Sequence, residues 1–197
     1  MREKFTIRGI IFSALFAAIF SAASFLNIHL GFSPVPITLE NLVVMLTGAF
    51  LGAGYGFFSM LLIVVLTTLG LPLIHGSGGL ALILGPTGGF IWMYPISAMC
   101  IGFIVERLKS KPIVSSILMF LSFEIFGSLV LYVTGVPWLA HVAGLSFGKA
   151  MLLGCYPYLP GDAIKALIAT SIAVPISQVY PIRRLIGKQD TNVVIAK

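Results

Sequence analysis

Long runs of apolar residues, separated by short segments rich in turn residues, dominate the hydropathy pattern of this sequence. A helix needs about 20 apolar residues to cross the hydrocarbon core of a bilayer. Runs of that order, bounded by Gly, Pro or polar clusters, predict membrane-spanning helices. We expect six of them, at residues 9–25, 39–51, 55–71, 88–105, 113–133 and 163–180.

The second predicted span is the weakest. Residues 39–51 are few for a full crossing, and they run into Gly52, Gly54 and Gly56. Two interpretations are open at this stage: a tilted helix, or a tight hairpin partner of the third span. The first span follows a basic segment, as a secretory signal does, but its apolar run is too long for a signal core and further spans follow. We expect it to be retained as a helix.

The composition excludes two broad classes of protein. Of the 197 residues, 58% are apolar and 9% are charged, whereas a soluble domain is about half apolar and about a quarter charged. A disordered chain would be poor in apolar residues and rich in charge. We therefore expect one all-α integral membrane domain over residues 1–197. The two cysteines, Cys100 and Cys155, argue against a disulfide scaffold or a thiolate metal site.

Basic residues form three clusters that set the expected orientation. They precede the first predicted span, separate the fourth from the fifth, and follow the sixth. Because Lys and Arg favour the cytoplasmic side of short loops, we expect a multi-pass protein of the cell membrane with both termini in the cytoplasm. The net charge of +6 then anchors the protein to membrane lipid, and no nucleic-acid partner is expected. The clusters are Arg2, Lys4 and Arg8; Arg107, Lys109 and Lys111; and Arg183, Arg184, Lys188 and Lys197.

Three connections remain for the other side of the membrane, at residues 27–38, 70–87 and 134–161. All three are rich in Gly, Pro or aromatic residues, whereas the cytoplasmic turns are short or merely basic. The unusual sequence is therefore concentrated on the outer face. This distribution favours an extracytoplasmic ligand site.

Asp162 and Lys165 are the strongest candidates for ligand contacts. Ionisable residues at membrane depth are costly and default to a functional interpretation. Pro160 and Gly161 mark the start of a helix, and residues three apart on a helix project from the same face. An acceptor and a donor on one face suit a small polar ligand. The alternatives are that Asp162 caps the helix and pairs with Lys165, or that Lys165 extends outward to the interface.

A glycine-rich segment precedes the fourth span and contains Gly85, Thr87 and Gly88. Glycine frees the backbone, and irregular backbone at membrane depth is tolerated only where it is buried in protein or lines a cavity. The segment is therefore a second candidate for ligand contacts. The alternative is a flexible loop followed by a helix start at Thr87.

No nucleotide-binding motif that could supply energy is visible in the sequence, and a metal site is not favoured. Residues 144–150 have the wrong glycine spacing for a phosphate-binding loop, and residues 52–56 do not fit a dinucleotide-binding loop. His29, His75 and His141 fall one in each outer connection without ligand spacing, which favours scattered interfacial histidines over a metal site. We expect no cofactor. Glu124 lies in the middle of the fifth span, either protonated or bonded to a neighbouring helix.

Small residues form a stripe along the first span. Ala14, Ala18 and Ala22 are four residues apart, and such stripes allow helix backbones to approach closely in lipid. The stripe is either a docking face for a partner or a packing face for other helices of this protein.

Three segments together resemble the BioY family, the biotin-specific S components of energy-coupling factor (ECF) transporters. They are PITLE at 36–40, GLPL at 70–73 continuing to GPTGGF at 85–90, and YLPGDAIKA at 158–166. The last two are specific in combination, and the similarity in order and spacing extends over most of the chain. Two positions depart from the family pattern: Glu40 stands where Gln is usual, and Phe90 where Tyr is usual.

The resemblance implies six helices and a biotin site beneath the outer loops. It implies charged contacts from Asp162 and Lys165, a polar edge from Thr87 with Gly85 and Gly88, and a place for Glu40 in the site. The alanine stripe would dock the shared transmembrane coupling subunit, which two ATP-binding cassette ATPases drive. The chain itself would not be an enzyme.

Two other classes of function compete with this one. A stand-alone secondary transporter of a small carboxylate or vitamin would show inverted internal repeats, and the two halves of this sequence show none. A membrane-embedded enzyme would need a nucleophile, a metal cluster or an acid–base pair, for which Asp162 and Lys165 alone are thin support.

Overall fold

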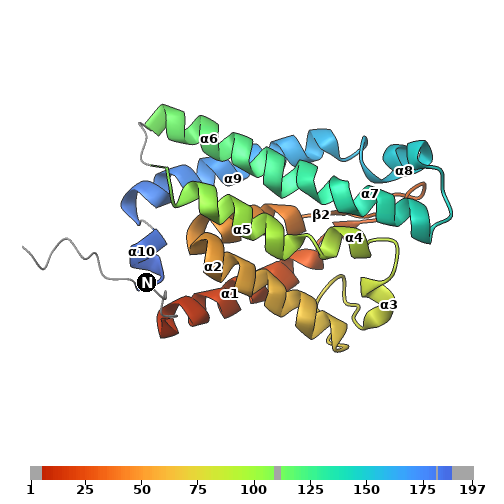
Figure 1. Cartoon of the computed structure of the whole chain (residues 1–197), viewed down its shortest axis with the longest axis horizontal. Helices are drawn as coiled ribbons and strands as arrows, with labels where there is room; N and C mark the ends of the chain where they lie inside the picture. The colour runs from red at the N-terminus through yellow and green to blue at the C-terminus, as the bar shows by residue number, and fades with distance from the viewer. Residues whose placement is uncertain (1–5, 109–111, 181, 188–197) are drawn as a thin grey trace, which may run out of the picture.

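The apolar runs form long helices that lie side by side (Figure 1). The computed structural model describes residues 6–108, 112–180 and 182–187. The prediction of an all-α membrane domain is confirmed. Five helical stretches are long and apolar enough to cross a membrane: Ile7–Ser24, Glu40–Thr68, Gly88–Val105, Ile113–Val142 and Leu159–Val179. The first of them is α1 (Ile7–Ser24), with Thr6 as its N-cap.

Helix α2 (Glu40–Thr68) contains two of the predicted spans and reverses direction at Gly52. The backbone there has a φ of 75° and a ψ of −176°, and a positive φ favours glycine. The arms on either side run back along each other: a Cβ atom added to Gly56 would lie 3.4 Å from the Cα atom of Gly48. Figure 1 shows them as an orange and a yellow arm. The second predicted span is therefore a hairpin partner of the third, and this hairpin accounts for the difference between five stretches and six spans.

The fourth predicted span is interrupted near its start. It consists of α4 (Gly88–Ile91) and α5 (Tyr94–Val105), with Pro95 in the first turn of α5. Proline has no N–H to donate and its ring excludes the carbonyl group four residues earlier, which here belongs to Ile91. The helix therefore restarts at Tyr94.

Two predicted helix boundaries were wrong. The fifth span consists of α6 (Pro112–Glu124), the π-helix η1 (Ile125–Leu129) and α7 (Val130–Val142). It therefore ends at Val142 and not at residue 133. The sixth, α9 (Leu159–Val179), starts before residue 163, because Pro160 fits the first turn of a helix. The predicted connection 134–161 therefore consists largely of helix, including α8 (Phe147–Gly154).

The short elements gather at the two ends of the molecule (Figure 1). Strands β1 (Asn27–Ile28) and β2 (Ile37–Thr38) pair antiparallel at the same end as α3 (Leu80–Ile83), α4 and α8, and α10 (Ile182–Leu185) lies at the opposite end. We call these the outer and the inner end. Arg8 lies at the inner end, beside Gly187. The predicted basic residues Arg2, Lys4, Lys109, Lys111, Lys188 and Lys197 lie outside the described residues.

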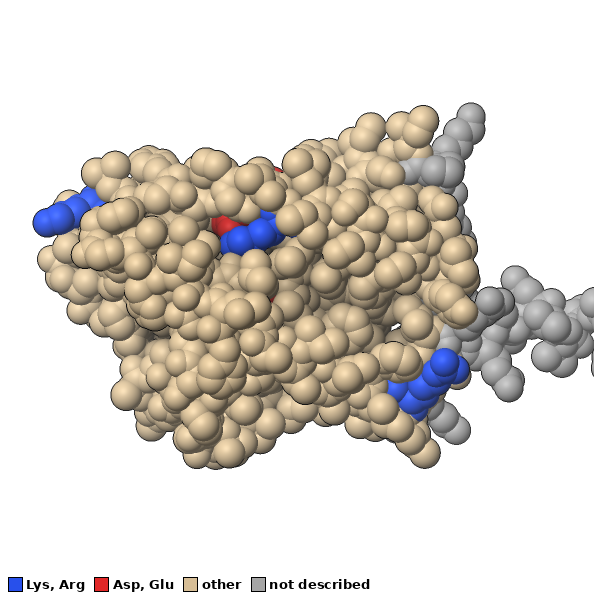
Figure 2. All heavy atoms as spheres, turned by 180° about the vertical axis from the view of Figure 1, so that it is seen from behind, with Lys and Arg blue, Asp and Glu red and all other residues tan. Residues whose placement is uncertain are grey.

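Two apolar clusters form the core, one in each half. The outer cluster includes Phe20, Ile74 and Leu139, and the inner one includes Leu51, Ile101 and Phe123. Many large apolar side chains elsewhere on the helices are exposed. Figure 2 shows a face that is mostly uncharged, as suits contact with lipid, with blue and red atoms in a hollow near its middle and blue atoms toward its two ends.

Candidate functional site

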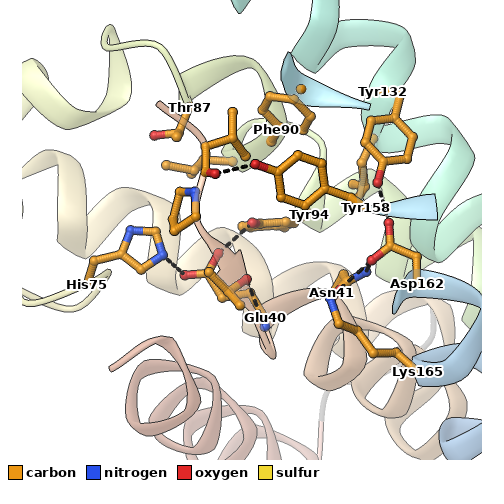
Figure 3. A pocket seen from close by; sticks show the side chains of 16 residues that line it. Glu40, Asn41, His75, Thr87, Phe90, Tyr94, Tyr132, Tyr158, Asp162 and Lys165 are labelled. Carbon is orange, nitrogen blue, oxygen red and sulfur yellow. Dashed lines mark hydrogen bonds and ion pairs between the residues drawn. The ribbon is translucent and has the colours of Figure 1, made fainter. Parts of the chain in front are cut away.

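A pocket lies beneath the outer loops, where segments distant in the sequence meet (Figure 3). The stretch before α2 and the first turn of α2 form one side of it, and α4, α5, α7 and α9 contribute the others. About half of its lining is apolar or aromatic and the rest is polar or ionisable, so apolar walls surround several convergent polar groups. The lining residues are Val35, Pro36, Thr38, Glu40, Asn41, His75, Thr87, Phe90, Ile91, Tyr94, Leu131, Tyr132, Gly154, Tyr158, Asp162 and Lys165.

Asp162 is the centre of a hydrogen-bond network at one end of the pocket. Its Oδ1 atom accepts from Asn41 Nδ2 at 2.8 Å and from Lys165 Nζ at 3.0 Å. Its Oδ2 atom accepts from the hydroxyl group of Tyr132. Lys165 Nζ also donates to Asn41 Oδ1 at 3.0 Å. Asp162 is only 4% exposed, so this network satisfies a carboxylate that would otherwise be costly to bury.

The local sequence explains why Asp162 and Lys165 share a face. Pro160 starts α9, and the two side chains lie one turn apart on it. They form the predicted ion pair, but Asp162 does not cap the helix, since Tyr158 occupies the N-cap position. Lys165 does not extend outward either, because its side chain is only 12% exposed.

Glu40 forms a second polar cluster in the pocket. Its Oε2 atom accepts a hydrogen bond from the hydroxyl group of Tyr94 at 2.7 Å, and its Oε1 atom lies 3.0 Å from His75 Nε2. Figure 3 shows His75 extending from the outer loop toward this carboxylate. Burial by itself lowers the pKa of His75, but the close approach and the charge of Glu40 outweigh it, and the pKa is raised above its ordinary value.

The interpretation of the three histidines as scattered interfacial residues, and not a metal site, did not foresee the contact of His75 with Glu40. Glu40 is 35 positions away from His75 in the sequence, and no local spacing connects them. Asn41, Tyr94 and Tyr132 were missed for the same reason. Among the described residues, no cluster of His, Cys, Asp or Glu could hold a metal ion.

The glycine-rich segment contributes one residue to the lining. Thr87 faces the pocket, half-buried, at the start of α4. Gly85 and Gly88 lie beside the pocket and not in its lining. The carbonyl oxygen of Gly85 accepts a hydrogen bond from Trp138 Nε1 at 2.9 Å, and a Cβ atom on Gly88 would lie 2.0 Å from the carbonyl oxygen of Ile83. These two glycines therefore allow close packing of the wall that carries Thr87.

Aromatic side chains form much of the pocket wall. The rings of Phe90 and Tyr132 meet edge to face, with centroids 6.0 Å apart. The hydroxyl group of Tyr158 donates to the carbonyl oxygen of Val35, which fixes the segment before β2 against the start of α9. The pocket therefore offers ring faces between its two polar clusters.

The alanine stripe of α1 lies on the surface. Ala14, Ala18 and Ala22 are exposed, whereas Ser13 and Ala17 on the other face are buried. Ser13 contacts α2, because its carbonyl oxygen accepts a hydrogen bond from Ser59 Oγ at 2.7 Å. Of the two interpretations of the stripe, packing against this protein's own described helices is therefore excluded.

Comparison with known proteins places this architecture in a family. The model of the BioY family matches residues 1–182. The chain belongs to the BioY family. BioY relatives include the biotin transporter BioY of Rhizobium etli, 41% identical over 180 residues that cover 89% of this chain and 96% of the relative. A probable biotin transporter BioY of Pyrococcus horikoshii is 40% identical and covers 81% of this chain and 90% of its own.

A solved structure matches this chain along most of its length. It is the crystal structure of the S-component for biotin from an ECF-type ABC transporter, with a TM-score of 0.75 and 30% identity. The match covers 87% of this chain and 92% of the other. The fold expected from the family resemblance is therefore confirmed.

Proposed function

We propose that this protein is the substrate-specific subunit of an ECF transporter, which captures biotin at the outer face of the cell membrane and delivers it across. The observation that carries the proposal is the buried pocket beneath the outer loops, with an acid and a cation hydrogen-bonded on one helix. Family membership and the similarity to an S-component for biotin support the identity of the ligand.

The chemistry of biotin suits the composition of this pocket. Biotin has a ureido group, an apolar thioether ring and tail, and a carboxylate. The ring faces of the pocket accommodate the apolar part, and Asp162 and Lys165 supply charge-assisted contacts to a polar end. Thr87 forms a polar edge on the opposite wall, and Glu40 places a carboxylate near the other end of the cavity.

Energy for transport comes from other subunits in this proposal. The sequence has no phosphate-binding loop, so a transmembrane coupling subunit and ABC-type ATPases would drive the movement. The exposed stripe of Ala14, Ala18 and Ala22 is the proposed docking face, because small residues let a partner helix approach closely.

The orientation is part of the proposal. With the pocket end outside, the inner end carries Arg8 and α10 on the cytoplasmic side, as the distribution of basic residues requires. Single cysteines introduced at Arg107 and at the exposed Leu80, in a protein whose Cys100 and Cys155 are replaced, test it by labelling in intact cells with an impermeant reagent. We expect labelling at position 80 only, and the reverse pattern would invert the topology.

The most direct test of the ligand is to identify the small molecule that remains bound after purification in detergent. We expect biotin by mass spectrometry. Calorimetry with added biotin on ligand-depleted protein should then show binding by this chain alone. Retention of a different vitamin, with no binding of biotin, would contradict the proposal.

A further inference from the structure

The two polar clusters of the pocket differ in how fully their hydrogen bonds are satisfied. At the first, both oxygen atoms of Asp162 have donors within this chain, and Lys165 binds two acceptors. At the second, Glu40 Oε1 and His75 Nε2 are buried and face each other at 3.0 Å, and neither has another hydrogen-bond partner among the described residues. The second cluster therefore keeps capacity for a ligand.

The second cluster, Glu40 and His75, determines the net charge of the pocket. The ammonium group of Lys165 balances the carboxylate of Asp162 at 3.0 Å, so the net charge of the pocket depends on Glu40 and His75. With His75 neutral, the pocket carries one uncompensated negative charge, and with His75 protonated it carries none. The side chains of His75 and Glu40 are 14% and 3% exposed, and charges in such a poorly hydrated cavity interact more strongly than in water.

The backbone holds His75 in place at a conformational cost. Its φ of 52° is positive, which it shares with no other described residue except glycines. Such a conformation is uncommon for histidine and is found preferentially at functional sites. The backbone N–H group of His75 donates to Ser24 Oγ at 3.2 Å, and Ile74 and Ser77 bridge across the turn. These contacts aim the imidazole ring at Glu40.

We propose that His75 takes up a proton when a ligand with one carboxylate binds in the pocket. The inference rests on the proposed function, since biotin carries one carboxylate. A carboxylate entering the pocket while His75 is neutral would add a second uncompensated negative charge. Protonated His75 removes that repulsion, so the anion and the proton bind together.

The titratable groups around His75 are consistent with this assignment. Glu40 faces it from α2 and Tyr94 from α5, while Tyr132, Tyr158, Asp162 and Lys165 line the remainder of the pocket. Glu40 already raises the pKa of His75 in the free protein. A bound anion would raise that pKa further. Affinity is therefore constant below the pKa of the free protein and falls as the pH rises from there to the pKa of the complex.

Calorimetry on the purified full chain tests the inference with two probes, biotin and its neutral amide. Between about pH 5.5 and about pH 8.5 an aliphatic carboxylic acid stays ionised while histidine titrates. We expect the affinity for biotin to fall by up to about tenfold per pH unit in part of this range, which is the limit for one linked proton. The binding enthalpy should depend on the buffer's ionisation enthalpy, and the amide should show neither effect.

His75→Gln removes the titratable group and keeps an N–H donor, and His29→Gln is the matched control, because His29 is exposed and outside the lining. We expect the affinity of H75Q for biotin to be independent of pH and equal to the affinity that the parent protein shows at high pH. The affinity of H29Q should depend on pH as that of the parent does. An unchanged pH dependence in H75Q, or equal pH dependence for biotin and its amide, overturns the inference. The comparison of probes needs only the parent protein. Absence of biotin binding at every pH would instead overturn the proposed function.

Discussion

Glycines let helix backbones approach closely in both halves of this protein, and the outer half in addition surrounds the described pocket. In the inner half, glycines let backbones touch: a Cβ atom on Gly102 of α5 would lie 2.2 Å from the carbonyl carbon of Gly52. In the outer half, side chains such as Asp162 and Tyr132 join helices by hydrogen bonds around a cavity. Lipid provides no hydrophobic force between helices, so close packing and hydrogen bonds must do this work.

The difference separates stability from binding. Backbone contact between Gly102 and Gly52 leaves no room for a ligand there. A cavity bordered by hydrogen bonds can exchange some of them for bonds to a ligand. Mutations in the two halves should therefore have different consequences.

The largest effect is expected from Gly102→Ala. The added methyl group would overlap the backbone of Gly52 and Ala53, which cannot move aside as a flexible side chain could. Overpacking costs about 1–3 kcal/mol or more, and about 1 kcal/mol shifts the melting temperature of a domain of this size by about 2–4 °C. Thermal unfolding in detergent, followed by circular dichroism, measures the loss.

The control is Gly54→Ala, since a Cβ atom there has nothing within 4 Å. It should leave the melting temperature unchanged or raise it slightly, because alanine favours a helix. A melting temperature of G102A equal to that of the parent would show that the inner half does not depend on backbone contact.

The next largest effect is expected from Asp162→Asn and Lys165→Met on the affinity for biotin. A hydrogen bond to a charged group contributes about 1.5–3 kcal/mol, or roughly ten- to a hundredfold in affinity. Calorimetry on the purified variants measures it. Glu106→Gln is the matched control at the inner end, where Glu106 Oε1 accepts from the backbone N–H of Ala53 at 3.0 Å. If both pocket variants bind biotin as the parent does, the two residues are structural, and the site must be sought around Thr87 and Glu40.

A smaller effect is expected from removing one hydroxyl group in each half. Tyr94→Phe deletes the donor to Glu40 and should weaken biotin binding by about two- to tenfold, the equivalent of about 0.5–1.5 kcal/mol. Tyr55→Phe removes a hydroxyl group that lies 3.1 Å from Thr6 Oγ at the inner end. It should lower the melting temperature without changing the affinity. Equal losses of affinity in Y94F and Y55F would erase the distinction between the halves.

The smallest effect on the isolated chain is expected from Ala18→Trp. Ala18 is exposed, so the bulky ring should leave both the melting temperature and the affinity for biotin unchanged while impairing uptake in cells that contain the whole transporter. Ala17→Trp, one position away, is the contrast, because Ala17 is 4% exposed and overpacking should destabilise the protein. Normal uptake by A18W would exclude this stripe as the docking face.

Local patterns in the sequence predicted the parts of the fold that depend on local interactions. Apolar runs located the helices, and the spacing of three residues placed Asp162 and Lys165 on one face of α9. The glycines after residue 51 left two interpretations open, because their neighbours on α5 are far away in the sequence. The extension of the fifth span to Val142 was missed, and the helix there continues through Pro137.

Most of the pocket lay beyond sequence reasoning because its contacts are long-range. Tyr94 bonds to a residue 54 positions away, and Tyr132 to one 30 positions away. Aromatic residues are common in any membrane helix, so nothing distinguished these two from lipid-facing ones. Glu40 was placed in the site only through the family resemblance, and its partner His75 carried no signal of its own.

The reversal at Gly52 has a consequence for how the chain enters the membrane during synthesis. Twelve helical residues (40–51) precede it and sixteen (53–68) follow, and each arm is shorter than the roughly 20 residues that a lone span needs. Neither arm is a good insertion signal alone, so the two should leave the translocation machinery as one paired unit. A side chain at position 52, which would disturb this reversal, is therefore expected to lower the amount of inserted protein as well as the stability of the finished molecule.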